Sequence, residues 1–86
     1  MTEDEIFEKE LEKTSALDLL PMFNDEKSRI TMATLVGAPI SFDRLRKICE
    51  KMNPLVTAMG FSGFVLDSDD KALWKSAIEY TKFLIR

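Results

Sequence analysis

The sequence predicts an all-α fold, a compact bundle of four to five short helices, and leaves open one short strand or hairpin besides. Apolar residues recur at helical spacing in the longer segments, and residues that cap helices stand where those segments begin. The 86 residues are 45% hydrophobic and 31% charged, which is typical of one globular domain, here 1–86, with a modest core.

The first expected helix runs to about Lys13, because Thr2 followed by Glu5 has the form of a capping box. Its apolar face is narrow, so we expect 1–14 to form a peripheral acidic helix or arm. The first 25 residues contain eight acids and two bases, whereas the rest contains seven acids and ten bases. This asymmetry predicts an acidic arm that meets a basic surface, within the molecule or on a partner, and a solvated helix face is the simpler alternative.

Residues 15–36 give a less regular pattern. A dense apolar run over 17–23 is interrupted by Pro21, which predicts a short helix or turn that plugs the core. A further segment over 25–36 should end at Gly37. Its β-branched residues favour a strand, whereas the spacing of its apolar residues favours a helix, and we prefer the helix.

The clearest helix covers 42–52, with Ser41 as its expected cap. Its apolar residues fall within an arc of about 120°, and charged residues occupy the opposite side, as in a surface helix that buries one stripe. The apolar residues are Phe42, Leu45, Ile48, Cys49 and Met52.

Asn53 and Pro54 interrupt this pattern and should start a short helix that ends before Gly60. Two helices with a brief break have the outline of a helix-turn-helix motif. However, the second helix offers no Arg, Lys, Asn or Gln to contact base edges, and the net charge of −3 opposes binding to phosphate. A DNA-binding regulator that uses 42–52 and the segment after it is therefore the alternative function, not the preferred one.

An extended connection over 61–66 should lead to a last helix, capped at Asp67 and running to the end of the chain. Phe83 lies on its otherwise polar side, and three interpretations stay open: a tolerated exposure, cover by the N-terminal helix, or an anchor for a partner. The expected core consists mainly of Leu20, Phe23, Leu35, Val36, Leu45, Ile48, Met52, Leu66, Leu73, Trp74, Ala77, Ile78, Thr81 and Leu84.

The chain lacks the residues that most often carry acid–base or nucleophilic chemistry. It has no histidine, and its single cysteine, Cys49, lies on an apolar stripe where burial should leave the thiol inert. The acids at Asp67, Asp69 and Asp70 fit helix capping better than a metal site. We therefore expect a protein that is not an enzyme, that binds no cofactor or metal, and that lacks a concave pocket with convergent polar groups.

The acidic start differs from a signal peptide, no apolar run approaches the roughly 20 residues of a membrane span, and one cysteine fits a reducing compartment. We expect a cytoplasmic, non-enzymatic protein-binding module without membrane contact: an adaptor, inhibitor or regulatory subunit. A homodimer is one form of such binding, and nucleic acid is disfavoured as a partner. The expected partner contacts are Phe7, Glu8, Leu11 and Glu12 on the arm, Arg44, Lys47 and Lys51 on the basic face, and Phe83.

Overall fold

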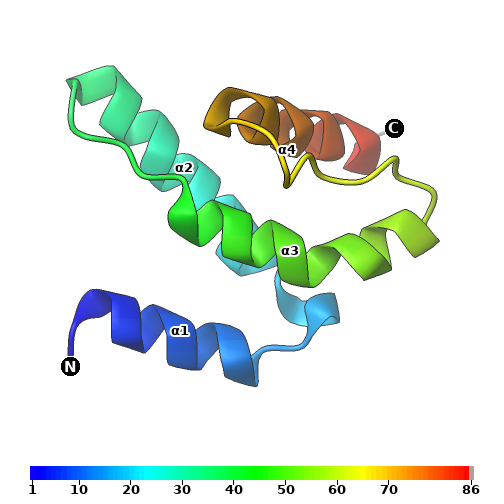
Figure 1. Cartoon of the computed structure of the whole chain (residues 1–86), viewed down its shortest axis with the longest axis horizontal. Helices are drawn as coiled ribbons and strands as arrows, with labels where there is room; N and C mark the ends of the chain where they lie inside the picture. Colours follow the sequence, from blue (N-terminus) through cyan, green and yellow to red (C-terminus); the bar gives the residue numbers. More distant parts are fainter. Residues whose placement is uncertain (86) are drawn as a thin grey trace.

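The structure is a computed structural model that describes residues 1–85, and it is an all-α bundle, as predicted. Over these residues there is no strand. In Figure 1 α3 crosses the middle of the molecule, with α1 along one side of it, α4 along the other and the start of α2 behind it. The elements are α1 (Glu3–Lys13), the 3-10 turn η1 (Ala16–Asp18), α2 (Leu20–Val36), α3 (Asp43–Ala58) and α4 (Asp70–Leu84).

The N-terminal helix α1 begins as the capping residues predict. The Thr2 hydroxyl accepts a hydrogen bond from the Glu5 backbone N–H at 3.2 Å. No residue of α1 is buried, so this helix lies on the outside of the bundle. Phe7 and Leu11 are its half-buried side chains, and they pack against the core.

Helix α2 is one long helix, and the expected break at Pro21 does not exist. It begins at Leu20, so Pro21 falls in the first turn, where a missing N–H removes no helical hydrogen bond. The preference for a helix over 25–36 is confirmed, and the helix ends at Gly37, whose N–H donates to the Thr34 carbonyl. Within the apolar run over 17–23, which was expected to fill the core, Leu19 is fully buried but Leu17 is 77% exposed.

Helix α3 also continues through its proline. A proline inside a helix has no N–H to donate, which typically costs about 3 kcal/mol and bends the helix, and Figure 1 shows α3 changing direction along its length. The buried stripe continues on both sides of Pro54, through Met52 and Val56, and this packing stabilises the helix across it. The predicted break, and with it the helix-turn-helix outline, is wrong.

The connection from Gly60 to Asp69 packs along α4 in extended form without becoming a strand. The Ser76 hydroxyl, which is buried, accepts a hydrogen bond from the Val65 N–H at 3.1 Å. The cap of α4 is Asp69, which accepts from the Ala72 N–H, and not the expected Asp67. The part of the polar side of α4 that carries Ser76 is therefore covered by this connection.

The core lies between α2, α3, α4 and the connection that precedes α4. Three predicted core residues are exposed instead: Leu35 at 75%, Val36 at 71% and Leu84 at 39%. Leu84 is the last residue of α4, and the other two lie on the end of α2, beyond the cover of the neighbouring helices. The buried apolar residues are Leu19, Phe23, Ile30, Leu45, Ile48, Cys49, Met52, Val56, Phe61, Phe64, Leu73, Ala77 and Tyr80.

Candidate functional site

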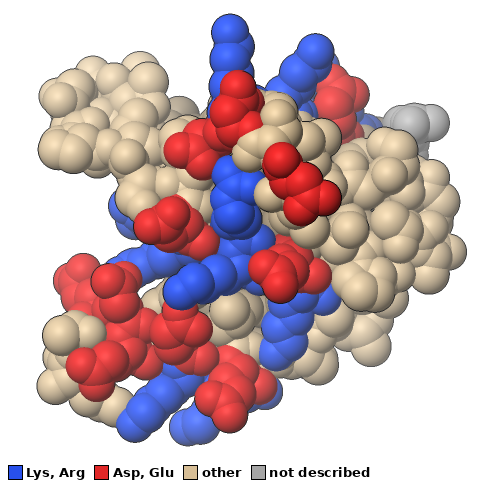
Figure 2. Space-filling view, in the orientation of Figure 1, with Lys and Arg blue, Asp and Glu red and all other residues tan. Residues whose placement is uncertain are grey.

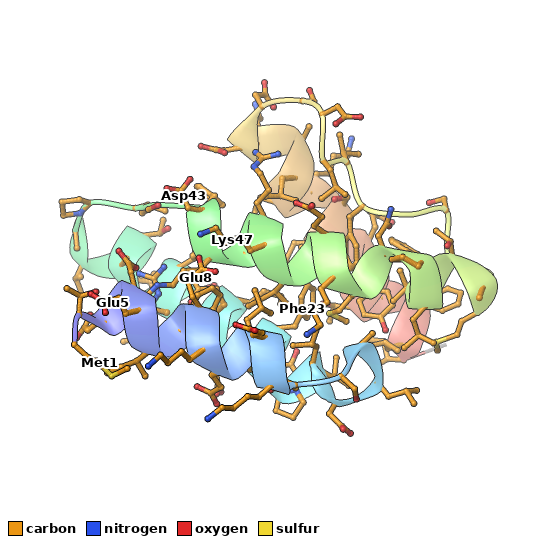
Figure 3. All side chains as sticks on the ribbon, turned by 60° about the horizontal axis from the view of Figure 1, so that its bottom comes forward. Met1, Glu5, Glu8, Phe23, Asp43 and Lys47 are labelled. Atoms are coloured by element: carbon orange, nitrogen blue, oxygen red, sulfur yellow. The ribbon has the colours of Figure 1, made fainter. Side chains whose placement is uncertain are left out.

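The acidic arm and the basic face that the sequence predicts meet each other within one chain. Arg44 donates to Asp4 through Nε at 3.2 Å and Nη2 at 2.9 Å, and Lys47 forms an ion pair with Glu8. Figure 3 shows Glu8 on α1 directed toward Lys47 on α3. Since later residues of α1 pair with later residues of α3, the two helices run parallel.

The same contact continues with hydrogen bonds to the end of α1. The Lys51 ammonium donates to the carbonyl oxygens of Leu11 and Glu12, the second at 3.5 Å. A lysine amine at the C-terminal end of a helix satisfies carbonyls that have no partner within the helix. Phe7 completes the contact, because the Arg44 guanidinium lies over its ring at 5.3 Å from the centroid.

Seven of the eight predicted partner contacts therefore lie in one contact between α1 and α3. Figure 2 shows how densely positive and negative side chains alternate over this part of the surface. Their role in binding a partner stays a prediction, and in the structure they hold α1 to α3. They are Phe7, Glu8, Leu11, Glu12, Arg44, Lys47 and Lys51.

A charged cleft of about 350 Å³ lies beside this contact, so the expectation that no concave site gathers polar groups is wrong. Arg29 is one of its lining residues, and it pairs with the buried Glu26 and donates to the Ser41 carbonyl at 3.4 Å. The hydrogen bond that Arg29 donates to Glu26 raises the pKa of Arg29, and the one that Lys47 donates to Glu8 raises the pKa of Lys47. Both groups therefore stay protonated, and neither can serve as a general base.

The eighth predicted contact, Phe83, lies in an aromatic cluster on the other side of the molecule. Its ring centroid is 5.6 Å from that of Phe61 and 6.2 Å from that of Tyr80. The side chain is half-buried, and it packs on the connection before α4. Phe83 is therefore neither covered by the N-terminal helix nor simply exposed to solvent.

Cys49 lies where the sequence predicts. The side chain is fully buried, and burial raises the pKa of its thiol to about 12. A thiol with such a pKa is almost entirely protonated at neutral pH, so it is a poor nucleophile. Among residues 1–85, no three His, Cys, Asp or Glu side chains are grouped so that they could hold a metal ion.

An exposed apolar surface on the end of α2 was not predicted from the sequence. Residues 30–42, which we call the neutral lobe, contain no charged residue. In Figure 1 the second half of α2 extends away from α3 and α4, and Figure 2 shows that this face of the projecting end carries no charged side chain. Four large apolar side chains of the lobe are exposed: Met32 at 59%, Leu35 at 75%, Val36 at 71% and Ile40 at 40%.

An apolar groove of about 410 Å³ lies next to these side chains. One wall is the face of α2 that carries Ile30, Thr34 and Leu35, and the other is formed by Phe42 and Trp74. The rings of Phe42 and Trp74 meet edge to face, with centroids 6.0 Å apart, which fixes the second wall.

The sequence does contain a signal for the exposure of the lobe. Phe23 and Ile30, seven residues apart, define the buried stripe of α2. At about 100° per residue, Leu35 and Val36 lie about 140° and 120° away from Ile30 around the helix. They therefore point away from the core once α2 is recognised as a single helix.

No helix within residues 1–85 has the length and apolar character needed to cross a membrane. In comparisons with known proteins, no family model matches the chain, and neither a curated protein nor a solved structure is detectably similar to it.

Proposed function

We propose that this protein is a non-enzymatic protein-binding module, an adaptor, inhibitor or regulatory subunit, that acts through the neutral lobe. The observation that carries the proposal is the exposure of Met32, Leu35 and Val36 on a projecting helix end without charged residues. Clustered apolar side chains exposed in this way usually mark a surface that is covered by another macromolecule. We expect this binding to take place in the cytoplasm, since the single thiol is buried in reduced form.

The charged residues support this location of the site by their own contacts. Arg44, Lys47 and Lys51 already have acceptors on α1, and Arg46 donates to the Leu66 carbonyl and pairs with Asp70 at 2.8 Å. A partner that used these side chains would first have to break contacts that hold the fold. Binding at the neutral lobe would break no such contact, because the exposed side chains of the lobe project beyond the other helices.

The DNA-binding alternative loses the features on which it depended. Helix α3 has no break at Asn53, and the four basic residues of its exposed face are occupied within the chain. Arg44, Arg46 and Lys47 are paired with carboxylates, and basic side chains neutralised in this way provide little attraction for phosphate.

Affinity capture with matched variants tests the proposal. The tagged chain, its Leu35→Asp variant and its Leu17→Asp variant are incubated with extract of the native host that also contains the untagged chain. Leu17 is a suitable control because it is 77% exposed, against 75% for Leu35, and lies on η1 away from the lobe. We expect at least one protein, another chain or the untagged copy, to be retained by the wild type and Leu17→Asp and lost by Leu35→Asp. Identical sets from all three baits would contradict the proposal.

A further inference from the structure

We infer that the occupant of the neutral lobe is the same lobe of a second copy of this chain, in a twofold symmetric dimer. This inference rests on the proposed function, because it assumes that the lobe binds protein. Two features of the lobe support a second copy: its projecting apolar stripe lies beside an apolar groove, and residues 30–42 carry no charge.

The stripe has the form of a helix that binds in a groove. Met32, Leu35 and Val36 stand at positions i, i+3 and i+4 on the end of α2, which is the spacing of anchors in helix-in-groove recognition. The groove beside them is lined by Ile30, Thr34 and Leu35 of the same helix and by Phe42 and Trp74.

Stripe and groove share one helix end, and this geometry favours a symmetric pair. In an interface with twofold symmetry, residue i of one copy contacts residue j of the other, and j contacts i. Two lobes placed side by side can thus each place the stripe of α2 in the groove of the other copy. Leu35 belongs to both features, so it should lie close to the symmetry axis.

The absence of charge on the lobe also favours an uncharged contact face such as a second lobe. Each chain has a net charge of −3, so two copies repel at most relative orientations. The residues that form the stripe and the groove are all uncharged, so a contact of the two features buries no charge of either. A partner with charges on its contact face would have to bury them against a surface that offers no counter-charge, which is costly.

The other long uncharged segment, 52–66, does not offer a comparable surface. It turns Met52, Val56, Phe61 and Phe64 into the core, and it leaves two large apolar side chains exposed, Met59 at 52% and Val65 at 41%. The neutral lobe instead exposes four large apolar side chains, Met32, Leu35, Val36 and Ile40.

Sedimentation velocity from about 1 µM to about 1 mM, the range in which small interfaces associate, tests the inference. We expect the wild type to shift from the mass of one chain toward twice that mass as concentration rises. Leu35→Asp should weaken the association at least about tenfold, because it places a charge at the centre of the interface. Leu17→Asp should dimerise like the wild type. A wild type that stays monomeric, or a Leu35→Asp variant that dimerises equally well, would overturn the inference.

A second measurement guards against effects on folding. In Val36→Cys and Leu17→Cys the introduced thiol is the accessible one, because Cys49 is fully buried. A short bismaleimide should cross-link Val36→Cys into a dimer faster than Leu17→Cys, and equal rates would count against a lobe-to-lobe contact. A monomeric wild type that still captures another protein through Leu35 would overturn the second copy as occupant and leave the proposed function standing.

Discussion

At Gly63 the connection before α4 lies close to two side chains of α3, Asn53 and Thr57. Its φ of +105° is strained for residues other than glycine, and a Cβ placed there would lie 3.3 Å from both Asn53 Oδ1 and Thr57 Cγ2. Asn53 cannot move freely, because its Oδ1 accepts a hydrogen bond from the Phe64 N–H at 2.9 Å. Because Gly63 has no side chain, the connection can lie close to α3, and the next residue, Phe64, is buried in the core.

We expect Gly63→Ala to lower the free energy of unfolding by about 1–3 kcal/mol, from backbone strain and from the close contact together. Urea denaturation measures it. Gly60→Ala is the matched control, because Gly60 has a similar φ of +100° but no atom within 4 Å of the added Cβ. Equal losses in the two variants would show that the contact with Asn53 contributes nothing.

Cys49 links stability to pH. Burial raises the pKa of its thiol from 9.0 to about 12, so between these values the unfolded chain loses a proton that the native chain keeps. The stabilisation is complete below about pH 9 and is lost as the pH rises toward 12, with a slope of up to about 1.4 kcal/mol per pH unit. Stability should therefore fall with rising pH in this window.

Urea denaturation of the wild type and Cys49→Ala from about pH 8 to about pH 11 isolates this effect. The alanine variant should be less stable at pH 8 and should show a shallower fall with pH. The buried Tyr80, whose pKa is also raised, titrates in both proteins and cancels in the difference. The same slope in both proteins would exclude the thiol as its origin.

At the scale of elements, α1 is the helix that depends most on charge. It has no buried residue, and exposed ion pairs of the kind that join it to α3 are individually weak. Their effect comes from their arrangement, since several pairs along two parallel helices act together with the packing of Phe7 and Leu11. We expect α1 to open before the rest of the molecule.

Charge reversal of the pair between Glu8 and Lys47 tests this expectation. Glu8→Lys and Lys47→Glu each replace an attraction by a repulsion, so hydrogen exchange of the α1 amides should become roughly two- to fivefold faster. The double variant restores an attraction with the opposite polarity and should recover most of the protection. High salt should reduce the differences among all four proteins. Single variants that exchange like the wild type would mean that this pair does not hold α1.

At the scale of the whole molecule, two leucines with the same side chain, Leu45 and Leu35, have different roles. Leu45 is fully buried, whereas the side chain of Leu35 is 75% exposed to solvent. The first belongs to the core between α2, α3 and α4, and the second to the neutral lobe. Apolar character therefore stabilises the fold in one place and, in our proposal, serves binding in the other.

In dilute solution, Leu45→Ala should cost about 2–5 kcal/mol of stability, because it leaves a cavity in a packed core. Leu35→Ala should change stability by no more than about 0.5 kcal/mol under the same conditions. Urea denaturation compares the two. A large loss for Leu35→Ala at a concentration where the chain is monomeric would show that the lobe is part of the core.

The sequence by itself determined the helical class, the start of α1 at its Thr2 cap, the stripe of α3 and the inert position of Cys49. These features depend on local rules: the period of a helix, the hydrogen bonds of a cap, and the burial of a narrow apolar face. It also predicted the acidic arm and the basic face, although not whether they would meet within one chain.

The tertiary structure decided what local rules leave open. Proline at position 21 is harmless in the first turn of a helix, and at position 54 its cost is offset by packing on both sides, so neither breaks its helix. The contacts between α1 and α3 join residues about 40 positions apart, and the exposure of the neutral lobe depends on where neighbouring helices end. Periodicity shows which residues share a face of a helix, but only the arrangement of the other helices determines whether that face is covered.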